Sequence, residues 1–437
     1  MAAHLTRRAT VAAFALLTSV SLALTGCTDS VFGGGGEVNS VDEQLSSRID
    51  EAVESAMQLA GANTAIVGVW SSAGEYVHAY GEGVSPSSPI RAAQASQPVM
   101  CALLLELVED GTVSLNREVS KDLPRQVGIE GITYGMLCDA TSGLADYKSQ
   151  LVDIFANNPT RGWSDRELIA HALAHSPLAA PGAEQQVSDT DTVLLGRALS
   201  DRTDQSLHEL LNTHVFDAAQ MGSSYFPVDP LIDVKLPGGG MNGFTYQFAG
   251  GQPVCTVSTP VEGGAEGETT ETAVDPTPVE EVSPSMLQGA GATVTTVTDL
   301  KRFYEQYLSK AFGSEENAAL ITTAPQAAEA PAGEAAEGGA AATAPTWTFG
   351  LEKQGGFYGM SGAMTGTLTA AYHDPTSGFT VVVTLNNSSA GANFVRALAL
   401  ELAAVSAADV GWSADEQRAV LQELAVCQPA TEEAPAE

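Results

Sequence analysis

The sequence predicts a mixed α/β protein (α+β type) in which one antiparallel sheet is built from both ends of the chain and a mainly helical region lies between them. Strand-like runs occur at 64–81 and again at 347–387. Between them, from Pro98 to about Phe312, apolar residues recur mostly at helical spacing. The length of 437 residues would suit one large domain or two smaller ones. Because both ends supply strands, one sheet-plus-helices unit is favoured.

The first elements are a helix and a hairpin. Apolar residues recur every three to four positions at Leu45, Ile49, Val53, Met57 and Ala60, and Asp42 is placed to cap the helix. The runs "TAIVGVW" and "EYVHAYG" follow, separated only by "SSAG", which predicts two paired strands.

The later elements are read in the same way. "VMCALLLELVED" (99–110) and "DLKRFYEQYLSKAF" (299–312) have the spacing of helices. "WTFGLE", "GTLTAAYHD" and "FTVVVTLNN" predict strands, the last two joined by "PTSG". The run "GANFVRALALELAAVS" (391–406) closes the main domain, for which we expect residues 43–408, and a further helix with an acidic tail is expected in 409–437.

Four segments are expected to carry little structure. Residues 260–284 and 324–345 are rich in Ala, Gly, Pro and Glu and almost free of large apolar residues, so they cannot bury enough surface to offset the entropy of ordering. The end of the tail, "PATEEAPAE", has the same composition, and the Gly-rich residues 27–42 resemble a flexible tether.

The first 26 residues have the features of a secretory signal peptide, with Arg7 and Arg8 ahead of an apolar run. The run is too short to span a bilayer comfortably. It ends in Leu-Thr-Gly-Cys, which resembles a bacterial lipobox, so we expect Cys27 to carry a lipid that anchors the protein to the outer face of the cell membrane. The alternative is an ordinary signal peptide with a chance cysteine.

The charge excludes several partners. The chain carries a formal net charge of -34, and removal of residues 1–26 would leave 17 basic and 53 acidic residues. Such a surface repels nucleic acid and anionic lipid headgroups. No phosphate-binding or dinucleotide glycine pattern is present, so no cofactor is expected. His171 and His175 have i, i+4 spacing but lack the remaining ligands of a zinc site, and no metal is expected.

Several strings resemble the serine β-lactamase and penicillin-binding protein superfamily, in the branch of class C β-lactamases and D-alanyl-D-alanine carboxypeptidases. They are "ALLLELVEDGTVSLNREVSKDLP", "ITYGMLCDATSGLADY", "PGAEQQVSDTDTVLLGRAL", "AGATVTTVTDLKRF" and "FYGMSGAMTG…AAYHDPTSG". They occur in the family's order over roughly residues 45 to 406. The resemblance implies the β-lactamase/transpeptidase-like fold, with a cleft between the sheet and the inserted helices.

The resemblance also suggests a pairing of the cysteines. Four cysteines remain after Cys27, and four cysteines allow three pairings. In the family fold Cys101 and Cys138 would lie on neighbouring helices. We therefore expect disulfides Cys101–Cys138 and Cys255–Cys427.

The three catalytic motifs of this branch are altered. The serine and lysine of S-x-x-K fall on Gln94 and Gln97, and Y-x-N falls on Val187-Ser188-Asp189. H/K-[ST]-G falls on Met360-Ser361-Gly362. A primary amide offers neither a nucleophilic oxygen nor a titratable proton. Loss of one such catalytic side chain costs about 10⁴ to 10⁶ in rate.

The sequence therefore predicts a non-catalytic binding or regulatory protein of the cell envelope, with a cleft lined by Gln94, Gln97, Ser188, Asp189, Ser361 and Gly362. We expect Asp189 to accept hydrogen bonds from both glutamines, since buried amides are seldom unpaired. The resemblance suggests a peptidoglycan stem peptide as ligand, or an envelope protein as partner. The alternative is an active hydrolase (carboxypeptidase, β-lactamase or esterase) whose nucleophile has moved. Cleft-filling by Val187, Met360 and Met364 would instead favour a scaffold.

Overall fold

The computed structural model describes residues 36–261, 269–325, 346–406 and 410–428. Within these ranges, none of the helices has the length and apolar character needed to cross a membrane. The helices are α1 Glu43–Ala60, α2 Gln97–Glu109, α3 Tyr134–Cys138, α4 Val152–Asn157, α5 Asp165–Leu173, α6 Asp189–Thr203, α7 Leu207–Leu211, α8 Val297–Leu308, α9 Glu315–Ala318, α10 Ala392–Val405 and α11 Ala414–Glu423.

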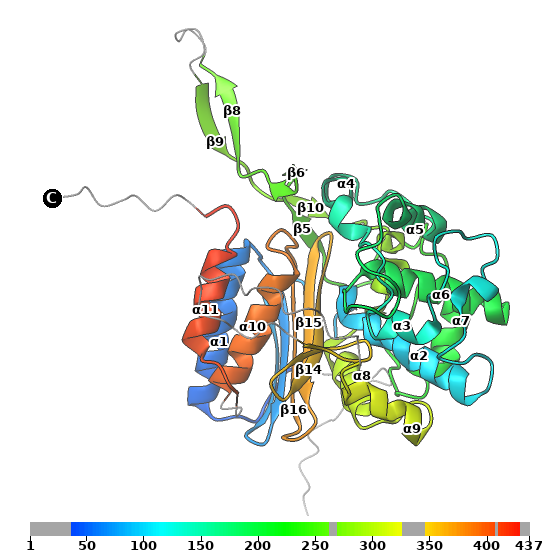
Figure 1. Cartoon of the computed structure of the whole chain (residues 1–437). Helices are drawn as coiled ribbons and strands as arrows, with labels where there is room; N and C mark the ends of the chain where they lie inside the picture. Colours follow the sequence, from blue (N-terminus) through cyan, green and yellow to red (C-terminus); the bar gives the residue numbers. More distant parts are fainter. Residues whose placement is uncertain (1–35, 262–268, 326–345, 407–409, 429–437) are drawn as a thin grey trace, which may run out of the picture. The chain divides into compact units, whose positions relative to one another are not determined.

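An antiparallel sheet of eight strands organises the protein, in the order β1-β3-β2-β16-β15-β14-β13-β12 (Figure 1). Its strands are β1 Val38–Asn39, β2 Ala65–Ser71, β3 Gly74–Tyr80, β12 Thr346–Trp347, β13 Glu352–Gln354, β14 Phe357–Met364, β15 Thr367–Asp374 and β16 Phe379–Leu385. N-terminal β2 pairs directly with C-terminal β16. The predicted fold class, with strands from both chain ends in one sheet, is confirmed.

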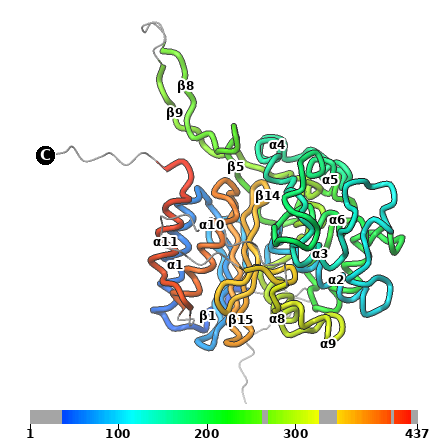
Figure 2. Tube along the Cα trace, in the orientation of Figure 1, coloured from blue at the N-terminus to red at the C-terminus, as the bar shows by residue number. Residues whose placement is uncertain are grey.

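Helices from the two chain ends cover one face of this sheet. In Figure 2 the blue α1 lies beside the orange α10 and red α11, and apolar side chains of α1 and α10 share a core with β2, β15 and β16. The ends of α1 follow from local sequence: Asp42 accepts a hydrogen bond from the Leu45 N–H, and Gly61 takes the left-handed conformation that ends the helix (φ 62°).

The inserted region covers the other face. Its largest core joins α2, α6 and α8 to the sheet, and α2 is buried along nearly its whole length. Short strands interrupt the helices in the inserted region: β4 Ile90–Arg91, β5 Gly243–Thr245, β6 Phe248–Ala249, β7 Gln252–Pro253, β8 Thr256–Pro260, β9 Thr269–Ala273, β10 Thr277–Val279 and β11 Val294–Thr295. Both predicted disulfides, Cys101–Cys138 and Cys255–Cys427, are present.

Two segments expected to be irregular contain strands. At the end of the predicted tether, β1 pairs with β3, so that Val38 lies opposite Val77. The edge of β3 offers unpaired backbone groups, and the two exposed residues of β1 satisfy them by backbone pairing, without burying a side chain. Residues 1–35, which include the predicted signal peptide and Cys27, lie outside the described residues.

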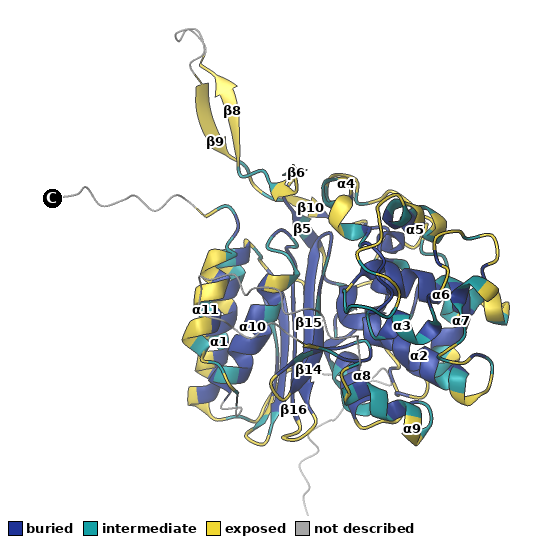
Figure 3. Ribbon diagram, viewed as in Figure 1, coloured by how far each residue is buried: buried dark blue, intermediate teal, exposed yellow. Residues whose placement is uncertain are grey.

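The predicted disorder of residues 260–284 is also corrected for the described part of that range, since residues 262–268 lie outside it. Strand β9 pairs with β8, and every residue of these two strands is exposed (Figure 3); β10 pairs with β5. Backbone hydrogen bonds form the hairpin, while Val279 and Val282 bury their side chains at its base. The second predicted insert lies outside the described residues, apart from Ala324 and Pro325.

The run "WTFGLE" forms two strands rather than one. Between β12 and β13 the chain turns, with the Thr348 N–H donating to the Leu351 carbonyl. Gly350 has a positive φ of 76°, and a Cβ there would lie 2.8 Å from Cys101 Sγ. The turn therefore packs closely on the Cys101–Cys138 disulfide, which alternation of side chains in the sequence did not reveal.

Candidate functional site

The turn before α2 places Gln94 and Gln97 inside the protein. Gln94 lies in a single 3₁₀ turn, Ala93–Ser96, and Gln97 is the first residue of α2. Both side chains are buried. Gln94 Nε2 donates to Asp189 Oδ2 at 2.5 Å, and Gln97 Nε2 donates to Asp189 Oδ1 at 2.6 Å. The predicted hydrogen bonds are therefore confirmed.

The backbone of this turn is strained. Ala93 has a φ of 47°, in the left-handed region that a residue with a Cβ rarely adopts. Such outliers cost of order 1 to 3 kcal/mol and gather at functional sites. Gln94 is thus held on a tight turn just before the first residue of the buried helix α2, and its side chain lines the cavity described below.

Strand β14 closes against the same turn. Gln94 Oε1 accepts a hydrogen bond from the Ala363 backbone N–H at 3.0 Å. A Cβ on Gly362 would lie 2.2 Å from the backbone nitrogen of Gln94, so only glycine at this position lets β14 come so close to the turn. Strand β13 pairs with β14 only as far as Gly359, so within the described residues no strand covers this edge of β14 from residue 360 onward. Gln94 therefore spans from α6 to this edge.

Asp189 is the first residue of α6 and the acceptor for both glutamines. Its own N–H donates to Asp146 Oδ1 at 3.1 Å. Burial raises the pKa of the Asp189 carboxyl to about 6; the Lys148 charge and the two glutamine hydrogen bonds oppose this rise, while the charge of Asp146 adds to it. The Asp189 carboxyl therefore keeps its proton to a higher pH than an ordinary aspartate does.

Lys148 is one of two cations in the cleft, and it was not predicted from the sequence. Its ammonium donates to the Ala363 carbonyl at 2.7 Å. Burial lowers the pKa of Lys148, and the charges of Asp189 and Asp146 oppose that change. The available signal was position: Lys148 directly follows the family-like string that ends at Tyr147.

A cavity of about 360 Å³ opens over these groups. Of the predicted residues, Gln94, Gln97, Val187, Asp189, Met360 and Ser361 line it. Other residues that line it were not predicted from the sequence, chiefly Asp146, Lys148, Trp347, Glu352 and Arg396. Arg396 is paired with Glu352 and donates to Gln354 Oε1 at 3.0 Å. The cavity thus presents three carboxylates, two cations and an indole.

The remaining serines near the site are engaged elsewhere. Ser188 caps α6 and donates to the Ala145 carbonyl at 3.1 Å; it lines a small neighbouring pocket that shares Gln97, Val187 and Met360 with the cavity. Ser142 donates to Asp191, and Ser96 donates to the Ala93 carbonyl. Across the described ranges no serine hydroxyl is hydrogen-bonded to a lysine, and His, Cys, Asp and Glu side chains do not gather in threes to hold a metal ion.

The chain belongs to the Beta-lactamase family, whose family model matches residues 49–405. The mixed α/β architecture with its eight-stranded antiparallel sheet is the fold of β-lactamases and transpeptidases. The resemblance drawn from sequence strings is therefore confirmed at the level of the superfamily.

Solved structures share the fold at low sequence identity. A D-stereospecific amidohydrolase from Streptomyces sp. is 20% identical with a TM-score of 0.61, over 78% of this chain and 95% of that one. A D-amino acid amidase from Ochrobactrum anthropi SV3 is 16% identical with a TM-score of 0.58, over 78% and 91%. The octameric penicillin-binding protein homologue from Pyrococcus abyssi is 16% identical, with a TM-score of 0.58 over 83% and 76%.

Proposed function

We propose that this protein is a non-catalytic binding protein of the cell envelope, whose cleft holds a ligand without cleaving it. The observation that carries the proposal is the pair of hydrogen bonds from Gln94 and Gln97 to Asp189. Acyl transfer by a serine needs a hydroxyl within reach of a base. At these positions the side chains are amides, and they are bonded to a carboxylate.

The position of Gln94 Oε1 supports the same conclusion. Oxyanion holes are built from backbone N–H groups that point to where negative charge develops. The Ala363 N–H, at this edge of β14, is such a donor, and it is already bonded to Gln94 Oε1. A substrate carbonyl would have to displace this side chain before it could be polarised.

The open cavity favours ligand binding over a purely structural role. Val187 and Met360 line it without filling it, and Met364 belongs to a separate apolar pocket. Trp347, Lys148 and Arg396 offer an aromatic surface and two cations. A peptide with a terminal carboxylate suits this set, and the peptidoglycan stem peptide is the candidate drawn from the family resemblance. Export and a lipid on Cys27 would bring the protein to that ligand.

Covalent labelling tests the absence of catalysis. We expect no adduct when the full chain is incubated with a fluorescent penicillin or a fluorophosphonate, because no nucleophile is activated in the cleft. A β-lactamase of the same family serves as the positive control. A stoichiometric adduct on the intact chain would refute the non-catalytic proposal.

A second candidate is a hydrolase that uses Ser361, since Ser361 and Lys148 line the same cavity. Labelling separates the two functions: an adduct that forms on the wild-type chain and disappears in Ser361→Ala would establish this alternative. Peptide mapping of the adduct identifies the serine directly.

Ligand binding is tested with an acylated Lys-D-Ala-D-Ala peptide. We expect saturable binding without turnover, weakened about tenfold or more by Lys148→Ala, because a charged contact is lost. Lys121→Ala is the matched control, since Lys121 is more than half exposed and its one ion pair among the described residues is with Glu118 at 3.7 Å. Equal affinity in the two variants, or no binding at all, would exclude the stem peptide as ligand of this cleft.

A further inference from the structure

A second cavity, which shares no lining residue with the cleft, lies between α5, α6, α7 and residues 226–231. Its volume is about 300 Å³, which is enough for a small molecule. Leu207, Phe226 and Leu231 give it an apolar wall, and charged side chains of α5 and α6 complete it. The proposed function does not use this cavity.

Arg197 lines the cavity and lacks a hydrogen-bond acceptor. Its side chain is only 11% exposed, and within the described residues the guanidinium makes no hydrogen bond. The nearest acid, Asp165 Oδ1, is 3.9 Å from Nη1, which is beyond hydrogen-bond distance. Guanidinium groups carry five N–H donors, and burying them unpaired is costly. A ligand that places an oxygen acceptor in the cavity beside Arg197 would therefore satisfy this guanidinium.

The charges around Arg197 restrict what that acceptor can be. Asp165, Asp201 and Asp229 line the same cavity, so one arginine is set among three carboxylates. His208 also lines the cavity, but its two ring nitrogens are engaged with the Phe226 carbonyl and with the Asn212 amide. Such a lining repels a dianion such as phosphate. It suits a carboxylate whose own molecule also carries a cation.

We infer that this cavity binds a small zwitterion of the α-amino acid class. The carboxylate pairs with the Arg197 guanidinium, which matches its planar, two-oxygen geometry. The ammonium group is held by Asp201 and Asp229; Asp201 is exposed and makes no hydrogen bond to another described residue. The apolar wall of Leu207 and Phe226 receives an aliphatic side chain.

Calorimetric titration of the full chain with leucine tests the inference. We expect saturable binding, with 4-methylpentanoate (no ammonium) and 3-methylbutylamine (no carboxylate) each at least about tenfold weaker, and no binding of inorganic phosphate. Arg197→Met, which keeps most of the side-chain volume, should weaken leucine binding about tenfold or more. Arg202→Met on the same helix is the control, since Arg202 donates to the Thr112 carbonyl and does not line the cavity.

Several results would overturn the inference. One is no binding of leucine, alanine or glycine at about 10 mM, well above the concentrations at which such charge-paired ligands bind. Another is unchanged affinity in Arg197→Met. If Arg197→Met does not fold, Asp201→Asn decides: leucine binding must weaken while 4-methylpentanoate binding stays the same. Binding that is lost in Asp189→Asn but kept in Arg197→Met would assign the amino acid to the cleft instead.

Discussion

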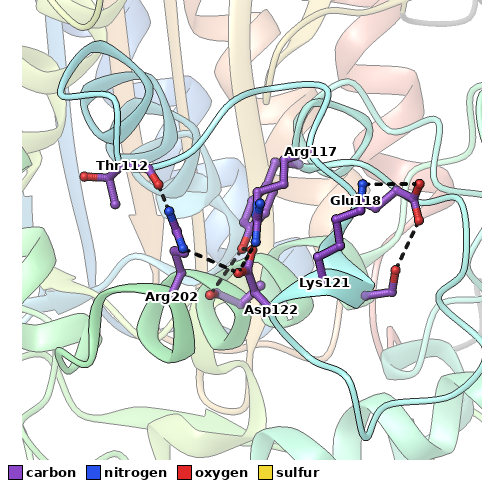
Figure 4. Close-up of polar contacts among 9 residues, drawn as sticks. Thr112, Arg117, Glu118, Lys121, Asp122 and Arg202 are labelled. Atoms are coloured by element: carbon purple, nitrogen blue, oxygen red, sulfur yellow. Dashed lines mark hydrogen bonds and ion pairs between the residues drawn. The ribbon is translucent and has the colours of Figure 1, made fainter.

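Asp122 in the helical region and Asp189 in the cleft are both aspartates that accept from two side chains. At Asp122 the main donor is a guanidinium: Arg117 Nε and Nη2 lie 2.6 and 2.8 Å from its two oxygens, and the Tyr134 hydroxyl donates at 3.0 Å. Arg202 adds a weaker contact at 4.0 Å, and Figure 4 shows how both arginines point to the same carboxylate. At Asp189 both donors are neutral amides.

The two carboxyls titrate in opposite directions. The Arg117 hydrogen bond lowers the pKa of Asp122, with further help from Tyr134 and Arg202. Burial raises the pKa of Asp189 to about 6, because two amides and the nearby Lys148 do not fully compensate the lost hydration. Two differences separate the carboxyls: Asp122 is less deeply buried and is paired with a guanidinium, whereas Asp189 is fully buried and is paired with neutral amides.

The largest expected loss of stability follows from removing the Asp122 carboxylate. Asp122→Ala should lower the free energy of unfolding by about 3 kcal/mol, because it leaves the Arg117 guanidinium partly buried without its acid. Urea denaturation measures the loss. Glu118→Ala is the control: its pair with Lys121 is exposed, and such pairs contribute at most about 1 kcal/mol. Equal losses in both variants would show that Asp122 is not a structural anchor.

A smaller effect is expected on the Asp189 side, and it depends on pH. Because the pKa of Asp189 is higher in the folded chain than the value near 4 of an unfolded one, the folded state binds the proton more tightly. Its contribution is therefore present at low pH and is lost as pH rises from about 4 to about 6. Relative to Asp189→Asn, wild-type stability should fall by about 2 kcal/mol over that range.

The same measurement on Asp122 should give the opposite sign. A lowered pKa gives stability that is present above the unfolded value and is lost as pH falls below about 4. Urea titrations of wild type, Asp189→Asn and Asp122→Asn at several pH values between 3 and 7 compare the two directly. A wild-type advantage over Asp189→Asn that grows with pH would contradict the raised pKa of Asp189.

The sequence predicted the contacts of Asp189 but not those of Asp122. The family-like strings fixed the register of Gln94, Gln97 and Asp189, and three polar groups brought to one cleft have few other partners. Arg117, Asp122 and Arg202 carry no motif, and their pairing depends on how α6 packs beside the chain after α2. Charged residues at ordinary spacing give no sign of which will be buried together.

Lys148 and the β8–β9 hairpin show two further limits. Lys148 lies one residue past a recognisable string, and only the fold brings its ammonium to the Ala363 carbonyl. The hairpin lies partly in a segment whose composition predicts disorder, yet backbone pairing needs no apolar side chains. The composition of a segment shows how much apolar surface it can bury. It does not show which of its backbone groups can form hydrogen bonds with another strand.

The smallest expected loss of stability comes from removing Arg202, the more distant of the two arginines that face Asp122. Arg202→Ala should cost about 1 kcal/mol or less, because its side chain is 39% exposed and 4.0 Å from Asp122, and its best contact is the Nε hydrogen bond to the Thr112 carbonyl at 2.9 Å. Arg117→Ala should cost clearly more in the same urea titration, because Arg117 supplies two short hydrogen bonds to the carboxylate. Raising the salt concentration should narrow the Arg202→Ala difference, since its attraction to Asp122 is largely through solvent. Equal costs for the two arginines would mean that net positive charge, rather than the paired geometry of Arg117, holds Asp122 ionised.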